Sequence, residues 1–161
     1  MAGAVQDAIE AIRVAFEALR IENGYQFDVR YTSRHLVAMD TLSSEQTPAV
    51  FVVRPPGETS KIEEMEGRVY RQVLALMIFG FLRTEGEENP DDAGLATSAE
   101  ALVSDIKKLV MTEAVKNPPF GDADLYQVLM VEDFNDAGWD SNGALVGVGI
   151  EAWVYWNKAR P

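Results

Sequence analysis

The stretch YRQVLALMIFGFLRT, from Tyr70 to Thr84, contains the longest nearly unbroken apolar run in the chain. Its apolar part, Val73 to Leu82, is too short to cross a bilayer as a helix, which needs roughly 20 residues. The flanking Arg71 and Arg83 suit strand ends that meet water. The stretch therefore predicts a central β-strand.

Successive side chains of a strand point to opposite faces, so this strand has two apolar faces. One face carries Val73, Ala75, Met77, Phe79 and Phe81, and the other carries Leu74, Leu76, Ile78, Gly80 and Leu82. A strand that is apolar on both faces must be covered on both, by helices of its own chain or by another subunit.

Length and composition predict a single folded domain spanning residues 1–161. The chain has 47% hydrophobic residues and no cysteine, which excludes disulfides, thiolate metal sites and cysteine nucleophiles. The N-terminus shows no basic segment before an apolar stretch, so we expect no signal peptide, no membrane anchor and synthesis in the cytoplasm.

The chain is strongly acidic, with 26 acidic and 14 basic residues and a formal net charge of -12. Binding to a phosphate backbone depends on Lys and Arg, so nucleic-acid binding is not expected. Such a surface suits a protein that DNA passes without sticking, and it equally suits plain solubility. The single histidine, His35, leaves little room for an imidazole metal site or a catalytic triad.

Apolar residues recur at helical spacing from Val5 to Leu19, which predicts an amphipathic helix. This helix should end at Gly24, because glycine suits a left-handed C-terminal cap. Alternation of apolar and polar residues from Tyr25 to Thr32 predicts a half-buried strand. The polar segment from Ser33 to Thr47 reads as a long surface loop.

The run Ala49 to Val53 is apolar and rich in β-branched residues, which predicts a short buried strand. The acidic segment Glu58 to Gly67 reads as a solvated turn or as an outward extension of the long strand. A second acidic run, Glu85 to Asp92, could chelate Ca²⁺, but beside Gly and Pro it favours a solvated loop.

A second helix is predicted to begin at Thr97, with Glu100 completing a capping box, and to stop before Asn117. Its buried face is expected to contain Ala99, Leu102, Val103, Ile106, Leu109 and Val110.

Two further strands are predicted, Tyr126 to Val131 and Leu145 to Trp156. The segment Glu132 to Gly143 resembles a calcium loop only superficially, because Ala137 and Ala144 occupy positions that need oxygen ligands. We therefore read it as a hairpin loop, with the Asn-Gly pair at its end as the turn.

The last strand also has two distinct faces. Its core face should carry Val146, Val148, Ile150, Ala152, Val154 and Trp156. The opposite face, with small Gly147 and Gly149 and aromatic Trp153 and Tyr155, reads as a surface that something else approaches.

These elements predict an α+β fold, a mostly antiparallel sheet with two helices packed on one face. The other face has no evident cover within the chain, so we expect it to mediate oligomerisation. Trp153, Tyr155, Gly147 and Gly149 are the candidate interface residues. A closed ring of identical subunits would bury this face.

No constellation of catalytic residues stands out. His35 lies in a polar loop, and the pairs Asp133 with Asp136 and Asp122 with Asp124 carry little information in so acidic a chain. Gly147-Val148-Gly149 lies within a strand and lacks the turn into a helix that a dinucleotide site needs. We expect no enzyme, no cofactor and no metal.

The order of elements resembles that of the tail terminator proteins of long-tailed bacteriophages. The similarity rests on the first helix with its Asn-Gly exit, the PAVFVV strand, the long Arg-containing apolar strand, the Ala-rich helix ending in Ile106-Lys107-Lys108-Leu109, and the final hairpin. It covers nearly the whole chain but contains no motif of functional residues.

The resemblance implies a small virion protein that assembles as a ring, in that family a hexamer. Such a ring caps the tail tube, stops its polymerisation and contacts the head-completion protein of the neck, while DNA passes through. The implied location is the virion tail, and the host cytoplasm during assembly.

Two alternatives stay open. The protein could be another neck or tail-tube component, or a stand-alone cytoplasmic binding module or acid-base enzyme that uses loop carboxylates. Solution mass at several concentrations separates a ring-forming subunit from a monomeric module.

Overall fold

The computed structural model describes residues 3–36, 41–83, 92–140 and 143–161. In chain order its helices and strands are α1 (Ala4–Ala15), β1 (Tyr31–Ser33), β2 (Ala49–Val53), β3 (Lys61–Met65), β4 (Val69–Arg83), α2 (Asp92–Ala114), β5 (Leu125–Asp140) and β6 (Gly143–Asn157). Short 3-10 helices occupy Phe16–Ala18, Ile21–Asn23, Ser44–Gln46 and Pro119–Gly121.

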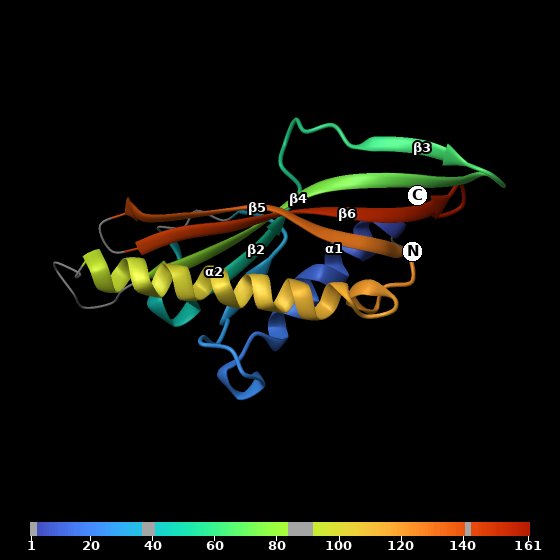
Figure 1. Cartoon of the computed structure of the whole chain (residues 1–161). Coiled ribbons are helices and arrows are strands. Elements are labelled where there is room, and N and C mark those ends of the chain that lie inside the picture. The colour runs from blue at the N-terminus through green and yellow to red at the C-terminus, as the bar shows by residue number, and fades with distance from the viewer. Residues whose placement is uncertain (1–2, 37–40, 84–91, 141–142) are drawn as a thin grey trace.

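The strands form one six-stranded sheet in the order β1-β2-β4-β6-β5, with β3 also paired to β4. Among the described strands, only β1 and β2 run parallel, and the other pairings are antiparallel. Both helices lie on the same side of the sheet, and the β3–β4 hairpin stretches away from them (Figure 1). The predicted α+β fold with a mostly antiparallel sheet is confirmed.

The central strand β4 has the two faces that its sequence predicts. It pairs along its full length with β6, from Val69 opposite Asn157 to Arg83 opposite Gly143. Leu74, Leu76 and Ile78 are buried beneath the helices. On the opposite face Val73, Ala75, Met77 and Phe79 are half-buried, and only Phe81 is fully buried. Burial of the first set in the main core is what holds the helices to the sheet.

Gly80 allows α2 to approach β4 closely. A Cβ atom at this position would lie 2.8 Å from Val146, 2.9 Å from Leu102 and 3.0 Å from Ile106. A larger side chain here would push α2 away from the sheet.

The two helices depart from prediction only at their ends. The first helix is α-helical to Ala15, and Gly24 adopts the expected left-handed conformation with a φ of 91°. The second begins at Asp92, so the prediction that Thr97 caps it is wrong. The physical reason is that Leu95 is buried one turn before Ala99 and extends the apolar stripe towards the N-terminus. The predicted buried face of α2 is confirmed.

The predicted strand from Tyr25 to Thr32 is mostly wrong, because only Tyr31–Ser33 pairs in the sheet. The backbone N–H groups of Gln26 and Phe27 instead donate to the Asp105 carboxylate at 2.9 to 3.1 Å. A long-range acceptor on α2 therefore takes the hydrogen bonds that a strand partner would have taken.

The segment Glu58 to Gly67 contains a strand, β3, which pairs with the first residues of β4.

The prediction of a hairpin loop over Glu132 to Gly143 is wrong, because β5 continues through Asp140. Glu132, Asp133, Asn135 and Asp136 of this part of β5 are exposed to solvent, so their polar side chains do not oppose pairing. Residues 85–91 of the predicted acidic loop lie outside the described residues. Asn142 of the predicted Asn-Gly turn also lies outside them.

Across the described residues, no helix is both long enough and apolar enough to span a membrane.

Candidate interaction surface

The sheet face opposite the helices, here called the outer face, consists of three zones. In the first zone, at β2, a segment of the same chain covers the outer face of the sheet. Leu42 packs with Ala49, Phe51, Val53 and Phe81 in a second small buried cluster. The segment predicted as a surface loop therefore contributes a core residue, and the outer face is less open than the sequence predicts.

In the second zone, at the middle of β6, side chains of β5 cover the two glycines. Phe134 lies opposite Gly147 and Glu132 lies opposite Gly149. A Cβ at Gly147 would lie 2.2 Å from Phe134 Cε1, and one at Gly149 would lie 2.7 Å from Glu132 Cγ. Both glycines, which the sequence analysis offers as interface candidates, are thus covered by side chains of the same chain. Phe134 then reaches Phe79 of β4, with ring centroids 6.0 Å apart.

The third zone is an open hollow of about 370 Å³ between β3 and β6. Its walls include Thr59, Lys61 and Glu63 on one side and Glu151 and Trp153 on the other, with Val73 and Ala75 in between. The apolar residues Val73 and Trp153 are only half-buried here. Of the outer face, this zone best matches the predicted uncovered surface.

Trp153 is held in the hollow by charged neighbours. The Arg71 guanidinium lies 5.0 Å from the centroid of the Trp153 ring, a cation–π contact. Arg71 also forms an ion pair with Glu63, which raises the pKa of the Arg71 guanidinium. Lys61 and Arg71 together lower the pKa of Glu63. Among the described residues, the buried Trp153 Nε1 finds no hydrogen-bond acceptor.

Tyr155 lies further along the same face and contacts the edge of the sheet. Its ring meets Tyr126 of β5 edge to face, with centroids 5.2 Å apart. Trp153 and Tyr155 thus lie on the outer face as predicted, and each is half-buried in the single chain. Part of the Trp153 and Tyr155 side chains therefore stays accessible, and a second molecule could bury it.

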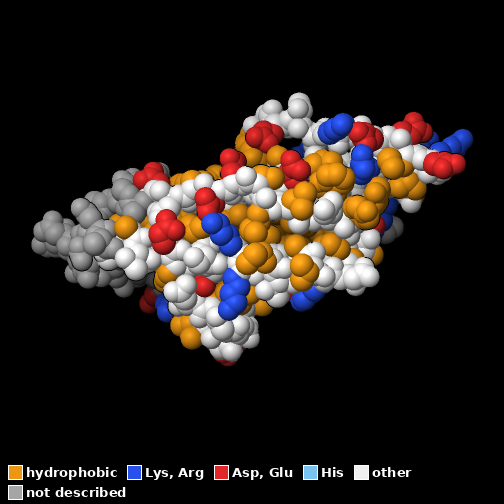
Figure 2. All heavy atoms as spheres, in the orientation of Figure 1, with side chains coloured by type: hydrophobic (Ala, Val, Ile, Leu, Met, Phe, Trp, Pro, Cys, Tyr) orange, Lys and Arg blue, Asp and Glu red, His pale blue; other side chains and the backbone are white. Residues whose placement is uncertain are grey.

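The first half of β5 forms an apolar edge of the sheet. Tyr126, Leu129, Met130 and Val131 are 58%, 40%, 38% and 55% exposed, and Leu125 to Val131 contains no charged residue. Hydrophobic side chains gather in the part of the molecular surface where β5 begins (Figure 2). An exposed apolar edge strand invites pairing with another chain.

Sequence reasoning missed this edge. It identified the strand from Tyr126 to Val131 but did not assign it to the edge of the sheet. A run that is apolar on both faces reads as a buried strand. Only the strand order shows that, in the part of the chain that the structure describes, β5 pairs with β6 alone.

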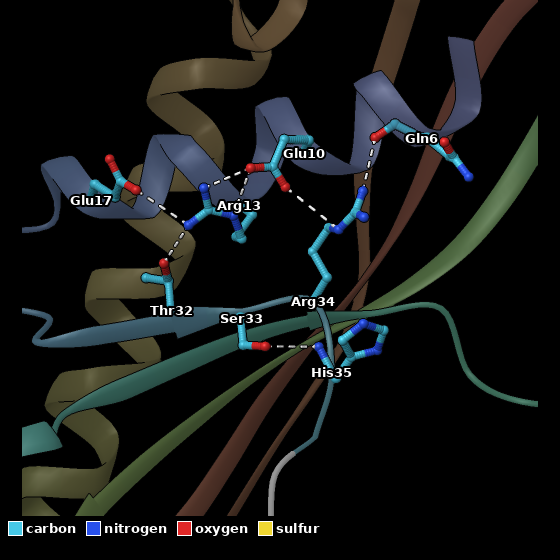
Figure 3. Close-up of polar contacts among 8 residues, drawn as sticks. All are labelled: Gln6, Glu10, Arg13, Glu17, Thr32, Ser33, Arg34 and His35. Carbon is cyan, nitrogen blue, oxygen red and sulfur yellow. Dashed lines mark hydrogen bonds and ion pairs between the residues drawn. The ribbon is translucent and has the colours of Figure 1, made fainter. Parts of the chain in front are cut away.

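His35 lies on the surface next to a network of arginines and glutamates (Figure 3). Its backbone N–H donates to Ser33 Oγ at 3.1 Å. The neighbouring Arg34 donates to the Gln6 carbonyl oxygen at 3.3 Å and lies 3.5 Å from Glu10 Oε2. These contacts link α1 to the end of β1.

Three of the carboxylates considered as catalytic candidates have structural partners instead. Asp133 forms an ion pair with Lys107 of α2, and Asp124 accepts from Arg160 at 2.5 Å. Asp122 accepts from the backbone N–H of Asp124 at 2.8 Å. Asp136 is exposed.

No group of three or more histidine and carboxylate side chains within the described ranges could hold a metal ion. The β5 edge and the hollow beside Trp153 offer apolar surface to another molecule. No protein-family model matches the chain, and no curated protein matches it either.

Proposed function

We propose that this chain is a structural subunit that assembles with copies of itself into a ring and acts as a bacteriophage tail terminator. The observation that carries self-assembly is the apolar edge of β5, where four large hydrophobic side chains are exposed on a strand that pairs only with β6 among the described strands. Burying such an edge against another copy removes apolar surface from water and satisfies backbone groups at the same time.

The half-buried Trp153 in the neighbouring hollow supports the same proposal. Tryptophan is enriched among the residues that dominate interface energies. It lies one strand away from the β5 edge, since Trp153 pairs with Gln127 in the β5–β6 ladder. A copy that docks on the edge could therefore also cover this zone of the outer face.

The terminator role itself rests on the resemblance in element order and on charge. In this proposal the ring, most simply a hexamer, caps the tail tube and contacts the head-completion protein. The net charge of -12 suits a channel that DNA crosses, because acidic side chains repel phosphate. The proposal gives no catalytic role to His35, and the His35→Ala variant should assemble like the parent.

Solution mass is the first test. Sedimentation velocity at several concentrations should show a ring mass that dissociates on dilution. A monomer at every concentration would contradict ring formation by the free protein and would favour the stand-alone binding module.

Electron microscopy of tails made without the protein tests the terminator role separately. Loss of a terminator should give overlong tubes, because nothing stops their polymerisation. Tubes of normal length that fail to join heads would instead assign the chain to another neck component.

A further inference from the structure

The sheet has a second exposed edge strand, β3, on the side away from β5. Among the described strands, β3 pairs with β4 alone and β5 pairs with β6 alone. Four of the five residues of β3 are exposed, and they include the hydrophobic Ile62 and Met65, which are 52% and 37% exposed. An edge strand that shows apolar side chains to water is suited to pairing with another chain.

The strand ladders place β3 level with the exposed apolar half of β5. Lys61 of β3 lies opposite Val73 of β4. Val73 lies opposite Trp153 of β6, which in turn lies opposite Gln127 of β5. Both strands therefore lie at the same end of the sheet, at the right in Figure 1. Rotation of one copy about an axis roughly parallel to the strands brings its β3 to the β5 edge of the next copy.

The remaining edge strand, β1, does not match the apolar half of β5. Followed across β2, β4 and β6 in the same way, Tyr31 of β1 lies level with Asp136, in the polar second half of β5. The three residues of β1 are half-buried, so this strand also offers less surface than β3.

The strand directions also suit a contact between β5 and β3. Each step from β3 through β4 and β6 to β5 is antiparallel, so β3 and β5 of one chain run in opposite directions. Rotation about an axis along the strands leaves their directions unchanged. The β5 strand of one copy and the β3 strand of the next would therefore pair antiparallel, which is the commoner kind of strand pairing.

Pairing of β5 with β5 of a second copy is the simplest alternative. Such a contact uses the same surface on both copies and closes a dimer about a twofold axis. It would leave Ile62 and Met65 of β3 in water. A contact between β5 and β3 uses both edges of every copy, and a contact between two different surfaces repeats from copy to copy until a ring closes.

We propose that the β5 edge of one copy pairs antiparallel with β3 of the next copy, so that one sheet continues across the subunit boundary. This inference rests on the proposed self-assembly and names the surface that the β5 edge binds. Residues of β3 form one wall of the hollow beside Trp153. The β5 strand of the next copy therefore lies at the rim of that hollow.

Mixing two variants tests whether the contact joins two different edges. Ile62→Lys impairs the β3 edge and Leu129→Lys impairs the β5 edge, because a lysine on an edge strand opposes pairing. Each variant alone should self-associate at least tenfold more weakly than the parent in sedimentation velocity. An equal mixture should form a dimer and nothing larger, since each mixed pair keeps one intact β5 and one intact β3.

Ile21→Lys is the matched control for Ile62→Lys. Ile21 is 59% exposed and lies in a 3-10 helix outside the sheet, so this variant should associate like the parent. Circular dichroism checks that every variant is folded.

Disulfide cross-linking tests the same contact without impairing it. The chain has no cysteine, so introduced thiols report only the chosen pair. Lys61→Cys mixed with Gln127→Cys should form a disulfide-linked dimer, because residues opposite each other in an antiparallel pair have Cβ atoms about 4.5 to 5.5 Å apart. Leu129→Cys in place of Gln127→Cys covers a register shifted by two residues.

The outcomes separate this inference from the ring proposal. Cross-linking of Gln127→Cys to itself but not to Lys61→Cys, full association of Ile62→Lys, or a monomeric mixture of the two lysine variants would overturn the β5–β3 contact if the parent assembles. A parent that stays monomeric at every concentration and forms no cross-link would contradict ring assembly itself, and this contact with it.

Discussion

Trp153 and Trp156 are three residues apart on β6 but have different surroundings. Trp156 stacks on Tyr70, with ring centroids 4.5 Å apart and an interplanar angle of 21°. Its Nε1 donates to Gln72 Oε1 at 3.0 Å, and Gln72 is buried. Trp153 instead lies on the outer face beneath Arg71. The two side chains should therefore contribute to different properties, Trp156 to stability and Trp153 to association.

The Trp156→Ala variant should lower the free energy of unfolding by about 2 to 4 kcal/mol, because it removes the stacked ring and leaves buried Gln72 without its donor. Urea denaturation measures the change. Trp156→Phe keeps most of the stacking and loses the hydrogen bond, so its effect should be intermediate. A larger loss of stability for Trp153→Ala than for Trp156→Ala would reverse the assignment of the two faces.

Asp105 provides a second prediction at this scale. It is 2% exposed and accepts from the backbone N–H groups of Gln26 and Phe27. Asp105→Ala should cost about 2 to 4 kcal/mol, because both donors lose their acceptor. Asp105→Asn keeps one acceptor oxygen and should cost less.

The stabilisation by Asp105 should also depend on pH. Burial raises the pKa of its carboxyl, against the opposing effect of the two backbone donors. The folded protein then binds this proton more tightly than the unfolded chain. The stability that Asp105 adds relative to Asp105→Ala should be greatest below the ordinary aspartate pKa of about 4, and smaller as pH rises through the folded pKa. Denaturation curves of both proteins across this range measure the difference, and an increase with pH would contradict the prediction.

Among the elements, β5 combines an unexpected length with an open edge. It runs from Leu125 to Asp140 and includes irregularities in its register with β6 after Leu125, Met130 and Asp136. Bulges of this kind twist an edge strand and re-aim its side chains. Glu132 and Phe134 of β5 cover the glycines of β6, whereas the part from Tyr126 to Val131 exposes apolar side chains to solvent.

Gly147→Ala should destabilise the protein by about 1 to 3 kcal/mol, because the new methyl group would overlap the Phe134 ring. Gly149→Ala is the matched control, and it should cost less because the group it meets is the flexible Glu132 side chain. In a Phe134→Ala background the cost of Gly147→Ala should shrink, and a double-mutant cycle by urea denaturation measures this coupling. Strict additivity would mean that the ring does not limit the space at residue 147.

The exposed edge of β5 should respond to charge. Val131→Lys should weaken self-association without unfolding the monomer, because a lysine on an edge strand opposes pairing with another strand. Val115→Lys is the control, since Val115 is 83% exposed and lies just after α2, outside β5. Sedimentation velocity compares both with the parent. Equal effects of the two lysines would show that net charge, and not the edge, governs association.

At the scale of the whole molecule, the two helices cover one face of the sheet and the chain covers part of the other. Leu42 and Phe134 cover two zones of the outer face, and the hollow beside Trp153 stays open. Association through the remaining zone and the β5 edge would leave the main core unchanged.

Trp153→Ala should therefore weaken assembly while leaving the monomer folded. Truncation of an interface anchor typically costs about 2 kcal/mol or more, which raises the dissociation constant more than tenfold. Sedimentation velocity gives the association, and circular dichroism checks the fold. Full assembly of Trp153→Ala, with loss of assembly in folded Trp156→Ala, would place the interface on the opposite face.

Local patterns were enough to predict the elements whose environment repeats along the chain. The apolar runs of β2, β4 and β6 and the stripe of α2 each alternate or recur with a fixed period, and burial follows that period. From these runs the α+β class, the faces of β4 and β6 and the outward position of Trp153 and Tyr155 could all be predicted.

Features that depend on residues far apart in sequence could be seen only in the tertiary structure. Residues 25–30 have the alternation of a strand, but the backbone N–H groups of Gln26 and Phe27 donate to Asp105. Those of Tyr25, Val29 and Arg30 donate to the carbonyl oxygens of Arg20, Leu19 and Pro48. Leu42 lies in a polar segment without a period, and β2 and β4 bury it. The position of β5 at the edge follows from the order of the strands in the sheet, which no local sequence pattern shows. The periodicity of apolar residues reflects only the local helix or strand geometry. Whether an edge or a face of the sheet is exposed depends on which distant segment of the chain packs beside it.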